Sequence, residues 1–274
     1  MRKYTVGIIG NGFVGDGQAF VFSANSEVRI YDINPLRATH TLEEVQECDF
    51  VFVAVPTPMR EDGSQDLSYI ENVFKSATST PIYIIKSTVL PGTTQMLIEK
   101  YPNLSIVFNP EFLTERSAKV DALTQSRIVI GGANDLTLEV SKLYEDRFIG
   151  RKIIQTDATS AELVKYMANT FLATKVSIMN EFKMLADKLE VNWEDTLAGF
   201  AGDPRIGQSH LQVPGPDGHF GYGGTCFPKD VNALLTLSSK VGVPLRTIQA
   251  GWETNLAVRP EQDWKNDKGR AVSK

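Results

Sequence analysis

The chain has 274 residues, enough for one large domain or two smaller ones. Hydrophobic residues make up 42% of it and charged residues 22%, an ordinary balance for a globular protein. The net charge of -5 gives no basic footprint, which argues against nucleic acid as a partner. No apolar stretch reaches the roughly 20 residues of a membrane span, and residues 1–12 lack the features of a signal peptide.

The sequence contains two cysteines, Cys48 and Cys226, with no CxxC pair, and three histidines. We therefore expect no metal site. Cys48 opens the apolar run CDFVFVAV and is predicted to be a small buried hydrophobic residue. This cysteine usage fits a reducing compartment, so we expect a cytoplasmic protein.

The first half of the chain alternates short apolar runs with amphipathic stretches. The runs are β-branched or aromatic and mostly unalternating, which predicts strands covered on both faces, at residues 4–10, 27–32, 49–55, 81–87, 104–109, 127–132 and 151–156. Helical patterns fall between them at residues 13–24, 68–78, 92–100 and 135–146. The second is predicted to begin with a Ser68–Glu71 capping box. This alternation predicts parallel βαβ units.

The character of the chain then changes. Residues 158–189 contain no glycine or proline, and their apolar residues recur at helical spacing, which predicts one helix of roughly 30 residues. Such a helix is a domain connector or a dimer spine, unless it is the core helix of a monomer. The pattern further predicts helices at 193–200, 229–241 and 244–257 with a Gly- and Pro-rich loop at 201–224, and a charged tail at 259–274 that lies on the surface or is frayed.

The first predicted strand leads directly into GNGFVG at residues 10–15, which has the GxGxxG spacing of a dinucleotide-binding turn. Gly10 permits the tight turn, Gly12 lets the backbone approach a pyrophosphate, and Gly15 allows the helix to pack closely on the strand. Phe13 and Val14 open that helix, whose N-terminus would face the phosphates.

An acidic residue, Asp32, ends the second predicted strand, where it can accept a hydrogen bond from a ribose 2′-hydroxyl. This carboxylate favours NAD, while the nearby Arg37 keeps NADP as an alternative. The sequence therefore predicts an α/β fold: a Rossmann-type, doubly wound parallel sheet over residues 1–156, a mostly helical domain with the long helix over 157–258, and the tail.

Polar segments follow the third, fourth and fifth predicted strands, at the edge where open α/β sheets bind ligands. Taken singly these are ordinary loop residues, but their repetition along one edge favours a binding role. The candidate residues are Val55, Pro56, Thr57, Ser87, Thr88, Glu111, Phe112, Leu113, Thr114 and Glu115. On the long helix, Lys165 and Asn169 share a face at i and i+4 and could hold an oxyanion, unless they are simply solvated surface residues.

Cys226 lies in the segment GYGGTCFPKD at residues 221–230, just before a predicted helix. The helix N-terminus and Lys229 would favour its thiolate, and Asp230 could orient Lys229 or manage a proton. The alternative is a buried structural cysteine. NAD with a nucleophilic cysteine suggests an aldehyde dehydrogenase or an alcohol-to-acid enzyme, because a thiohemiacetal can give up a second hydride and the resulting thioester can be hydrolysed.

These motifs resemble the UDP-glucose/GDP-mannose dehydrogenase family over nearly all of residues 4–255. The matching segments, in the family's order, are GIIGNGFVG, VAVPTP with DGSQDLSYIE, KSTVLPGTT, FNPEFLTERSAKVD, AELVKYMANTFLATKVSIMNEF, DPRIG and GYGGTCFPKD. The resemblance implies four-electron oxidation of the C6 alcohol of a nucleotide sugar, for which we expect UDP-glucose, with NAD as cofactor and a homodimer formed through the long helix.

The resemblance also implies roles by position. Cys226 resembles the thiohemiacetal nucleophile, and Lys165 with Asn169 the pair that stabilises the oxyanion. Residues that resemble groups holding a water or shuttling protons are Thr88, Glu115 and Asp230, accompanied by Glu111. Implied substrate contacts are Glu111, Phe112, Leu113, Thr114, Lys165, Asn169, Arg205, Tyr222, Gly223, Gly224 and Cys226. Candidate cofactor contacts are Gly10, Gly12, Phe13, Val14, Gly15, Asp32, Arg37, Val55, Pro56, Thr57, Ser87, Thr88, Glu115 and Lys229.

Arg205, in the segment DPRIG, resembles an arginine that reaches into the neighbouring subunit's site. The family's usual chain continues into a third α/β domain that binds the nucleotide, whereas this sequence ends at Lys274. We expect a shortened form, a naturally minimal form, or one completed by a partner. Two other functions stay open: a two-electron hydroxyacid or polyol-phosphate dehydrogenase, which would not need Cys226, and a non-catalytic NAD-binding protein.

Overall fold

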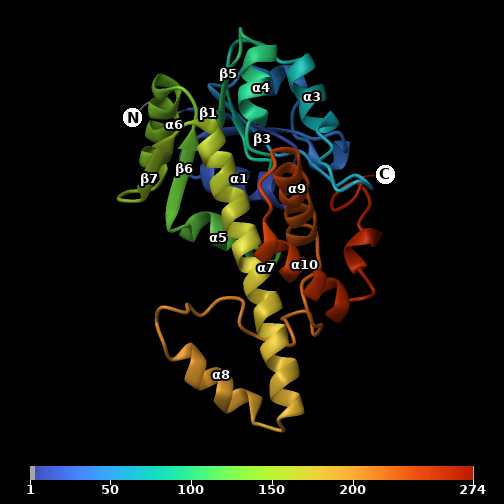
Figure 1. Cartoon of the computed structure of the whole chain (residues 1–274). Coiled ribbons are helices and arrows are strands. Elements are labelled where there is room, and N and C mark those ends of the chain that lie inside the picture. The colour runs from blue at the N-terminus through green and yellow to red at the C-terminus, as the bar shows by residue number, and fades with distance from the viewer. Residues whose placement is uncertain (1–3, 274) are drawn as a thin grey trace. The chain divides into compact units, whose positions relative to one another are not determined.

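The computed structural model describes residues 4–273, which form a seven-stranded sheet followed by a helical region (Figure 1). The strands are β1 (Thr5–Ile9), β2 (Glu27–Tyr31), β3 (Phe50–Val53), β4 (Ile82–Ile85), β5 (Ser105–Phe108), β6 (Arg127–Gly131) and β7 (Lys152–Thr156). The helices are α1 (Phe13–Phe22), α2 (Leu42–Gln46), α3 (Ser68–Lys75), α4 (Thr93–Lys100), α5 (Ala118–Thr124), α6 (Asn134–Arg147), α7 (Ala158–Lys188), α8 (Trp193–Ala201), α9 (Phe227–Lys240) and α10 (Arg246–Val258). Short 3-10 turns are η1 (Pro35–Arg37), η2 (Glu115–Ser117) and η3 (Asp263–Asn266).

The strand order is β2-β1-β3-β4-β5-β6-β7, and neighbours from β2 to β5 run parallel. The expected α/β fold with a mostly parallel sheet is confirmed. One junction differs, because β5 meets β6 antiparallel through Phe108 and Gly131, while β7 is parallel to β6. The expectation of parallel units throughout is therefore wrong at this point. An antiparallel neighbour needs no crossover helix, and the intervening α5 packs instead beside α1.

The sheet has a core on each face, as its unalternating strands predict. Alternate strand residues point to opposite faces. One face, with Ile8, Phe52 and Ile84, packs against α1, α5 and α6. The other, with Val51 and Tyr83 among its members, packs against α2, α3, α4 and the start of α7. The continuous apolar character of each strand follows, because neither face meets solvent.

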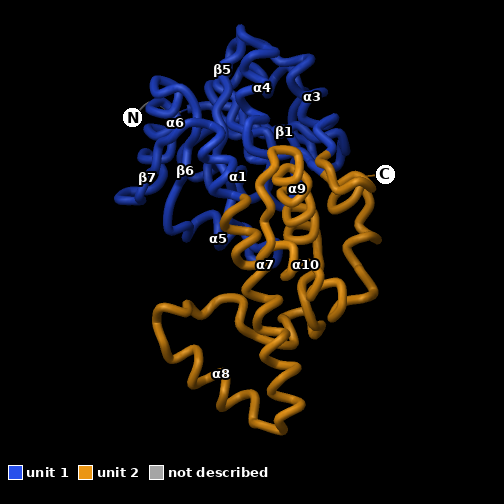
Figure 2. The backbone as a smooth tube through the Cα atoms, in the orientation of Figure 1, with its two compact units in different colours: residues 1–57, 66–165 blue, residues 58–65, 166–274 orange. Residues whose placement is uncertain are grey.

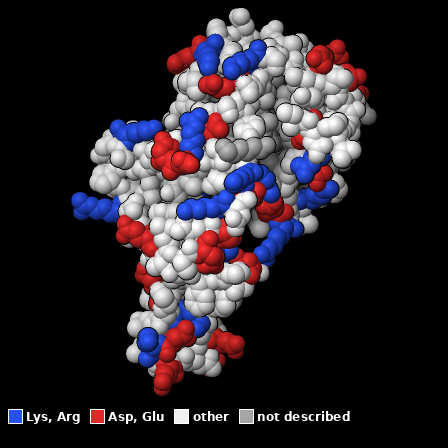
Figure 3. All heavy atoms as spheres, turned by 90° about the vertical axis from the view of Figure 1, so that its right-hand side faces the viewer, with Lys and Arg blue, Asp and Glu red and all other residues white. Residues whose placement is uncertain are grey.

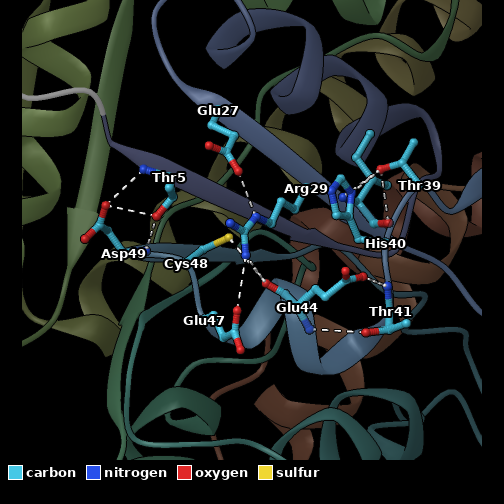
Figure 4. Close-up of polar contacts among 11 residues, drawn as sticks. Thr5, Glu27, Arg29, Thr39, His40, Thr41, Glu44, Glu47, Cys48 and Asp49 are labelled. Atoms are coloured by element: carbon cyan, nitrogen blue, oxygen red, sulfur yellow. Dashed lines mark hydrogen bonds and ion pairs between the residues drawn. The ribbon is translucent and has the colours of Figure 1, made fainter.

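The start of α3 differs from the prediction. Ser68 is the first helical residue, Leu67 is the N-cap, and no side chain caps the helix. The backbone N–H of Ser68 is bound instead by the carboxylate of Asp66 at 3.0 Å. A capping box forms in α2, where Thr41 and Glu44 each accept a hydrogen bond from the other's backbone N–H (Figure 4).

Cys48 is fully buried, as predicted, in the core on one face of the sheet, and its sulfur lies beside Arg29 (Figure 4). Burial raises the pKa of its thiol to about 11, so at neutral pH it is a small apolar side chain. The neighbouring Arg29 contacts Glu27 at 3.0 Å and Glu47 at 3.4 Å. On the adjoining strands, the Asp49 carboxylate accepts hydrogen bonds from the backbone and the hydroxyl of Thr5. These contacts tie β1, β2 and β3 together.

The chain divides into two compact units (Figure 2). The first runs to Thr57 and resumes over Asp66–Lys165, so it holds the sheet. The second consists of Pro58–Gln65 and the chain from Tyr166 onwards. The helix α7 is 31 residues long and contributes to both units. The predicted long helix is thus confirmed. The boundary between the two units falls within it, between Lys165 and Tyr166.

The sequence left two alternatives for the segment after α10, a surface position or fraying, and the structure excludes fraying. Trp264 is 2% exposed and Ala271 is 1% exposed. Met59 donates its backbone N–H to the carbonyl of Ala271 at 2.9 Å, and Ser273 donates to the carbonyl of Met59 at 2.8 Å. The few apolar residues of this segment are therefore sufficient to hold it within the second unit; Lys274 lies outside the described residues.

Acidic and basic side chains are interspersed on the face shown in Figure 3. Within residues 4–273, no helix combines the length and the hydropathy needed to cross a bilayer. The same described residues contain no group of three His, Cys, Asp or Glu side chains arranged to hold a metal ion.

Candidate active site

In the first unit, the glycines of the predicted dinucleotide turn each have a distinct steric reason. Gly10 has a positive φ of 91°, and a Cβ there would lie 2.6 Å from the carbonyl oxygen of Ala54. A Cβ on Gly15 would lie 2.0 Å from the carbonyl oxygen of Gly10. Gly12 is the N-cap of α1, and a Cβ there would meet nothing within 4 Å. The space above Gly12 is therefore open, as approach of a pyrophosphate requires.

The carboxylate predicted to bind a ribose, Asp32, is held firmly. It accepts the backbone N–H of Asn11 at 2.7 Å and that of Asn34 at 2.8 Å. A carboxylate has further lone pairs, so it can still accept from a sugar hydroxyl. The Asn11 amide donates to the carbonyl of Arg37 at 2.8 Å, while its own side-chain oxygen is buried without a hydrogen-bond partner among the described residues. This orphaned acceptor and the open Gly12 fit a dinucleotide.

A small cavity of about 280 Å³ brings together Phe13 at the start of α1 and Glu115 in η2. Both were predicted to contact the cofactor. Asp16 and Lys119, which form an ion pair at 2.9 Å, also line it. Val14 is half-buried in the same first turn of α1. The cavity thus lies beside the helix N-terminus that would face the phosphates.

The hydroxyls that follow β3 and β4 serve partly as internal ties. Ser87 donates to the carbonyl of Val55 at 2.7 Å, and Thr57 donates to the carbonyl of Thr88 at 2.8 Å. The side chains of Ser87, Thr88 and Thr57 are buried, and Pro56 between them is exposed. The structure therefore places these predicted cofactor residues at one sheet edge, with two of the hydroxyls engaged by the backbone.

Beyond β5, Glu111 and Lys165 form a buried ion pair. The Lys165 ammonium donates to the Glu111 carboxylate at 2.8 Å and to its backbone carbonyl at 2.7 Å. Burial opposes ionisation of Glu111, but the charge and hydrogen bond of Lys165 outweigh it and hold the pKa of Glu111 below its usual range. Phe112 lies 5.7 Å below the same ammonium, and Leu113 donates its N–H to the Glu111 carboxylate at 2.6 Å. Lys165 is therefore a buried cation and not a surface residue.

A second buried lysine, Lys86, was not among the predicted site residues. Its ammonium donates to the Asn109 side chain at 2.9 Å and to the carbonyl of Pro110 at 3.3 Å. Burial lowers the pKa of Lys86 to about 7; Glu111 opposes this shift and Lys165 adds to it. A lysine ending an apolar strand between Ile85 and Ser87 was the available signal.

In the second unit, Cys226 is the N-cap of α9, as predicted, with Pro228 in the first turn. Its thiol is half-buried and lies 3.6 Å from the Thr225 hydroxyl. Lys229 and Asp230, in the same turn, contact each other at 2.5 Å. The thiol therefore lies at the positive end of a helix dipole, which is a typical setting of reactive cysteines.

Asn169 is also buried, so the surface alternative fails for it too. It is 7% exposed, and its amide donates to the Asp230 carboxylate at 2.6 Å. An amide NH2 carries two N–H groups, which leaves Asn169 a second donor for a ligand. Asp230 thus holds Lys229 with one oxygen and Asn169 with the other, and it orients both.

The remaining predicted substrate residues are dispersed. Tyr222 is buried, Gly223 lies against Arg259, and Gly224 has a positive φ of 71° with open space where a Cβ would be. Thr114 is exposed, with its backbone N–H bound by Asp121 at 2.7 Å. In its own chain, Arg205 is exposed and pairs with Asp203.

The helix α7 turns its polar side chains inward and many apolar ones outward. Buried polar residues on it are Glu162, Lys165, Asn169, Thr170, Ser177 and Asn180. Glu162, which sequence analysis passed over, accepts the backbone N–H groups of Gly92 and Thr94 at the start of α4. Apolar side chains at least 40% exposed are Leu163, Met167, Phe171, Ile178, Phe182, Met184 and Leu185.

Two family models match the chain. Residues 33–148 match the NAD binding domain of the UDP-glucose/GDP-mannose dehydrogenase family, and residues 159–257 match its central domain. The first match begins after the glycine turn, so the turn is independent evidence for a dinucleotide.

Similar whole proteins point the same way. A UDP-glucose 6-dehydrogenase of Rickettsia conorii is 37% identical over 77% of this chain and 50% of its own. A UDP-glucose 6-dehydrogenase of Campylobacter jejuni is 33% identical over 90% of this chain and 71% of its own. The structure of a UDP-glucose dehydrogenase from Pyrobaculum islandicum superposes with a TM-score of 0.84 at 28% identity, covering 93% of this chain and 68% of that one. The chain spans about half the length of most curated relatives it matches.

Proposed function

Because the chain belongs to the UDP-glucose/GDP-mannose dehydrogenase family, we propose that it oxidises the C6 alcohol of a nucleotide sugar, UDP-glucose, to the carboxylate with two NAD. The observation that carries this proposal is the arrangement at the start of α9. Cys226 caps the helix, and the buried Asp230 in the first turn fixes both Lys229 and Asn169. A two-electron dehydrogenase has no use for a nucleophile in these surroundings.

The first oxidation converts the alcohol to an aldehyde, with a hydride and a proton leaving the substrate. NAD, when bound at the Gly10–Gly15 turn, supplies the acceptor for one hydride in each of the two oxidations. Glu115 and Thr88 are proposed to hold the water that takes the hydroxyl proton. Lys165 is pre-oriented by Glu111 to face the oxygen.

The second oxidation is proposed to run through the thiol. The sulfur of Cys226 bonds to the aldehyde carbon, and the carbonyl oxygen becomes an alkoxide that Lys165 and Asn169 stabilise. Loss of hydride from that carbon leaves a thioester. A water, deprotonated with help from Asp230, then attacks the carbon and breaks the carbon–sulfur bond, which releases the carboxylate and restores the thiolate. One alcohol, one water and two NAD are consumed in total.

The exposed apolar side of α7 supports the second part of the proposal, a homodimer through this helix. Leu163, Met167 and Phe171 recur at four-residue spacing, and Phe171 is 71% exposed. A row of large apolar side chains on one helix face favours burial against another protein surface. A second copy offers the same row, so the contact can be self-complementary.

The test of the chemistry is the number of NADH formed per UDP-glucose consumed, measured by absorbance and by product analysis. We expect two for the wild type. For Cys226→Ser we expect at most one, because the hydroxyl cannot form the second oxidation's adduct efficiently. A wild-type ratio of one would falsify the four-electron mechanism, and full activity of Cys226→Ser would favour a two-electron dehydrogenase. NAD binding without turnover of any nucleotide sugar would favour a non-catalytic protein.

A further inference from the structure

The loop that presents Cys226 is held by a buried amide of α10. Asn255 is fully buried, and its side-chain oxygen accepts the backbone N–H of Tyr222 at 2.7 Å. Its amide N–H donates to the carbonyl of the same Tyr222 at 3.1 Å. One side chain thus satisfies both backbone groups of a loop residue, as a neighbouring β-strand would.

Two further residues hold the same loop. Asn180, on α7, accepts the backbone N–H of Gly221 at 3.0 Å. Arg259, whose side chain is 3% exposed, binds Asp263 through two nitrogens and Asp217 through a third at 2.8 Å. It also donates to the carbonyl of Phe220 at 3.4 Å. The two carboxylates therefore fix the orientation of the guanidinium that contacts the loop.

Two glycines of the loop are explained by these contacts. A Cβ on Gly221, where φ is 67°, would lie 2.5 Å from the side-chain oxygen of Asn255. A Cβ on Gly223 would lie 2.5 Å from a terminal nitrogen of Arg259. Only a backbone without side chains can approach the end of α10 this closely.

We infer that Asn255 and Arg259 are positioning residues, which hold the Gly221–Gly224 loop and thereby set the place of Cys226 at the start of α9. The claim that this placement matters for turnover rests on the proposed function. Only Thr225 separates Cys226 from the loop, so a displacement of Tyr222 also shifts the backbone that carries the thiol. The loop lies outside the helices and strands, so its backbone depends on these side chains for hydrogen bonds, while the Tyr222 ring packs against Phe227 and Trp252.

The test compares Asn255→Ala with Gln249→Ala, a change of an exposed amide on the same helix that donates to Glu253 at 2.8 Å. In Asn255→Ala, hydrogen exchange at Tyr222 should accelerate at least about tenfold, because its buried N–H loses the acceptor that Asn255 provides. Exchange within α9 and α10 should change far less. Asn255→Asp keeps the acceptor alone and should restore part of the protection at Tyr222.

Two measurements separate positioning from mere stability. The kcat for NADH formation should fall about ten- to a hundredfold in Asn255→Ala, while the Kd for NAD stays that of Gln249→Ala, because small misplacements of a nucleophile are costly. The rate of Cys226 alkylation by iodoacetamide should differ at least about threefold between the two variants, since thiol reactivity follows its surroundings.

The inference is overturned if the loop amides keep their protection, if exchange accelerates equally throughout α9 and α10, or if both kcat and alkylation are unchanged. A wild-type protein without turnover would refute the proposed function alone, because exchange and alkylation still report on the loop.

Discussion

Replacing Lys86 by methionine should stabilise the protein at neutral pH, and the gain should shrink as pH rises. The buried ammonium has a pKa lowered from 10.5 to about 7. At pH 7 this lysine is therefore fully protonated in the unfolded chain but only about half protonated in the folded protein. A shift of this size corresponds to about 4 kcal/mol of lost stability at pH 7, at about 1.4 kcal/mol per pKa unit. The lost hydrogen bond to Asn109 offsets part of it, although Tyr144 still donates to that oxygen.

The sign of the pH dependence follows from linkage. Between the folded pKa and the unfolded pKa, the unfolded state binds more protons, so the wild type gains stability as pH rises. Integrating the difference in proton binding between the unfolded and folded states from pH 7 to pH 9 gives a gain in the free energy of unfolding of about 2 kcal/mol. Lys86→Met lacks the group, so its advantage over the wild type should fall by the same amount.

The assay is urea unfolding of both proteins at pH 7, 8 and 9, followed by circular dichroism. Lys100→Met is the matched control, because its ammonium lies on the surface of α4 beside Glu71 and meets water in both states. That variant should run parallel to the wild type over the whole range. A difference between Lys86→Met and wild type that is constant from pH 7 to pH 9 would refute the reasoning.

Other outcomes follow from single positions. Gly12→Ala should leave the free energy of unfolding unchanged but weaken NAD binding at least about tenfold in a fluorescence titration, because a Cβ there meets only open space; unchanged affinity would place the pyrophosphate elsewhere. Gly15→Ala should lower the free energy of unfolding by about 2 kcal/mol or more, owing to the 2.0 Å approach to Gly10, and an undiminished urea midpoint would contradict this. Phe171→Glu should convert a dimer to a monomer in sedimentation, whereas Ile149→Glu, at an exposed site off α7, should not; an unchanged mass for both would exclude the α7 contact.

Much of the fold was predictable because its signals are local. Each strand is an apolar run of a few residues, the glycine turn lies within six positions, and α7 has no helix breaker. The N-cap position of Cys226 was predictable for the same reason, because Pro228 and the helical pattern follow at once.

What could not be predicted depends on partners far along the chain. The spacing of Lys165 and Asn169 fixes a shared helix face, but not whether that face is buried. Both side chains are buried together with a partner, Glu111 for Lys165 and Asp230 for Asn169. These partners are more than 50 residues away in the sequence, so the helical spacing of apolar residues cannot reveal them. The direction of β6 and the burial of Trp264 are of the same kind. Charged composition could not decide whether the tail is frayed, because its order depends on Arg259, which is buried among carboxylates.

The pairing of Met59 with Ala271 and Ser273 has a consequence for the order of folding. The segment Pro58–Gln65 leaves the sheet early in the chain, yet the backbone partners of Met59 lie far along the sequence, at Ala271 and Ser273. Closing so long a loop is slow, because chain entropy must be lost before the contact forms. We therefore expect the first unit to fold before the Met59 pairing forms, and this pairing to be among the late steps of refolding.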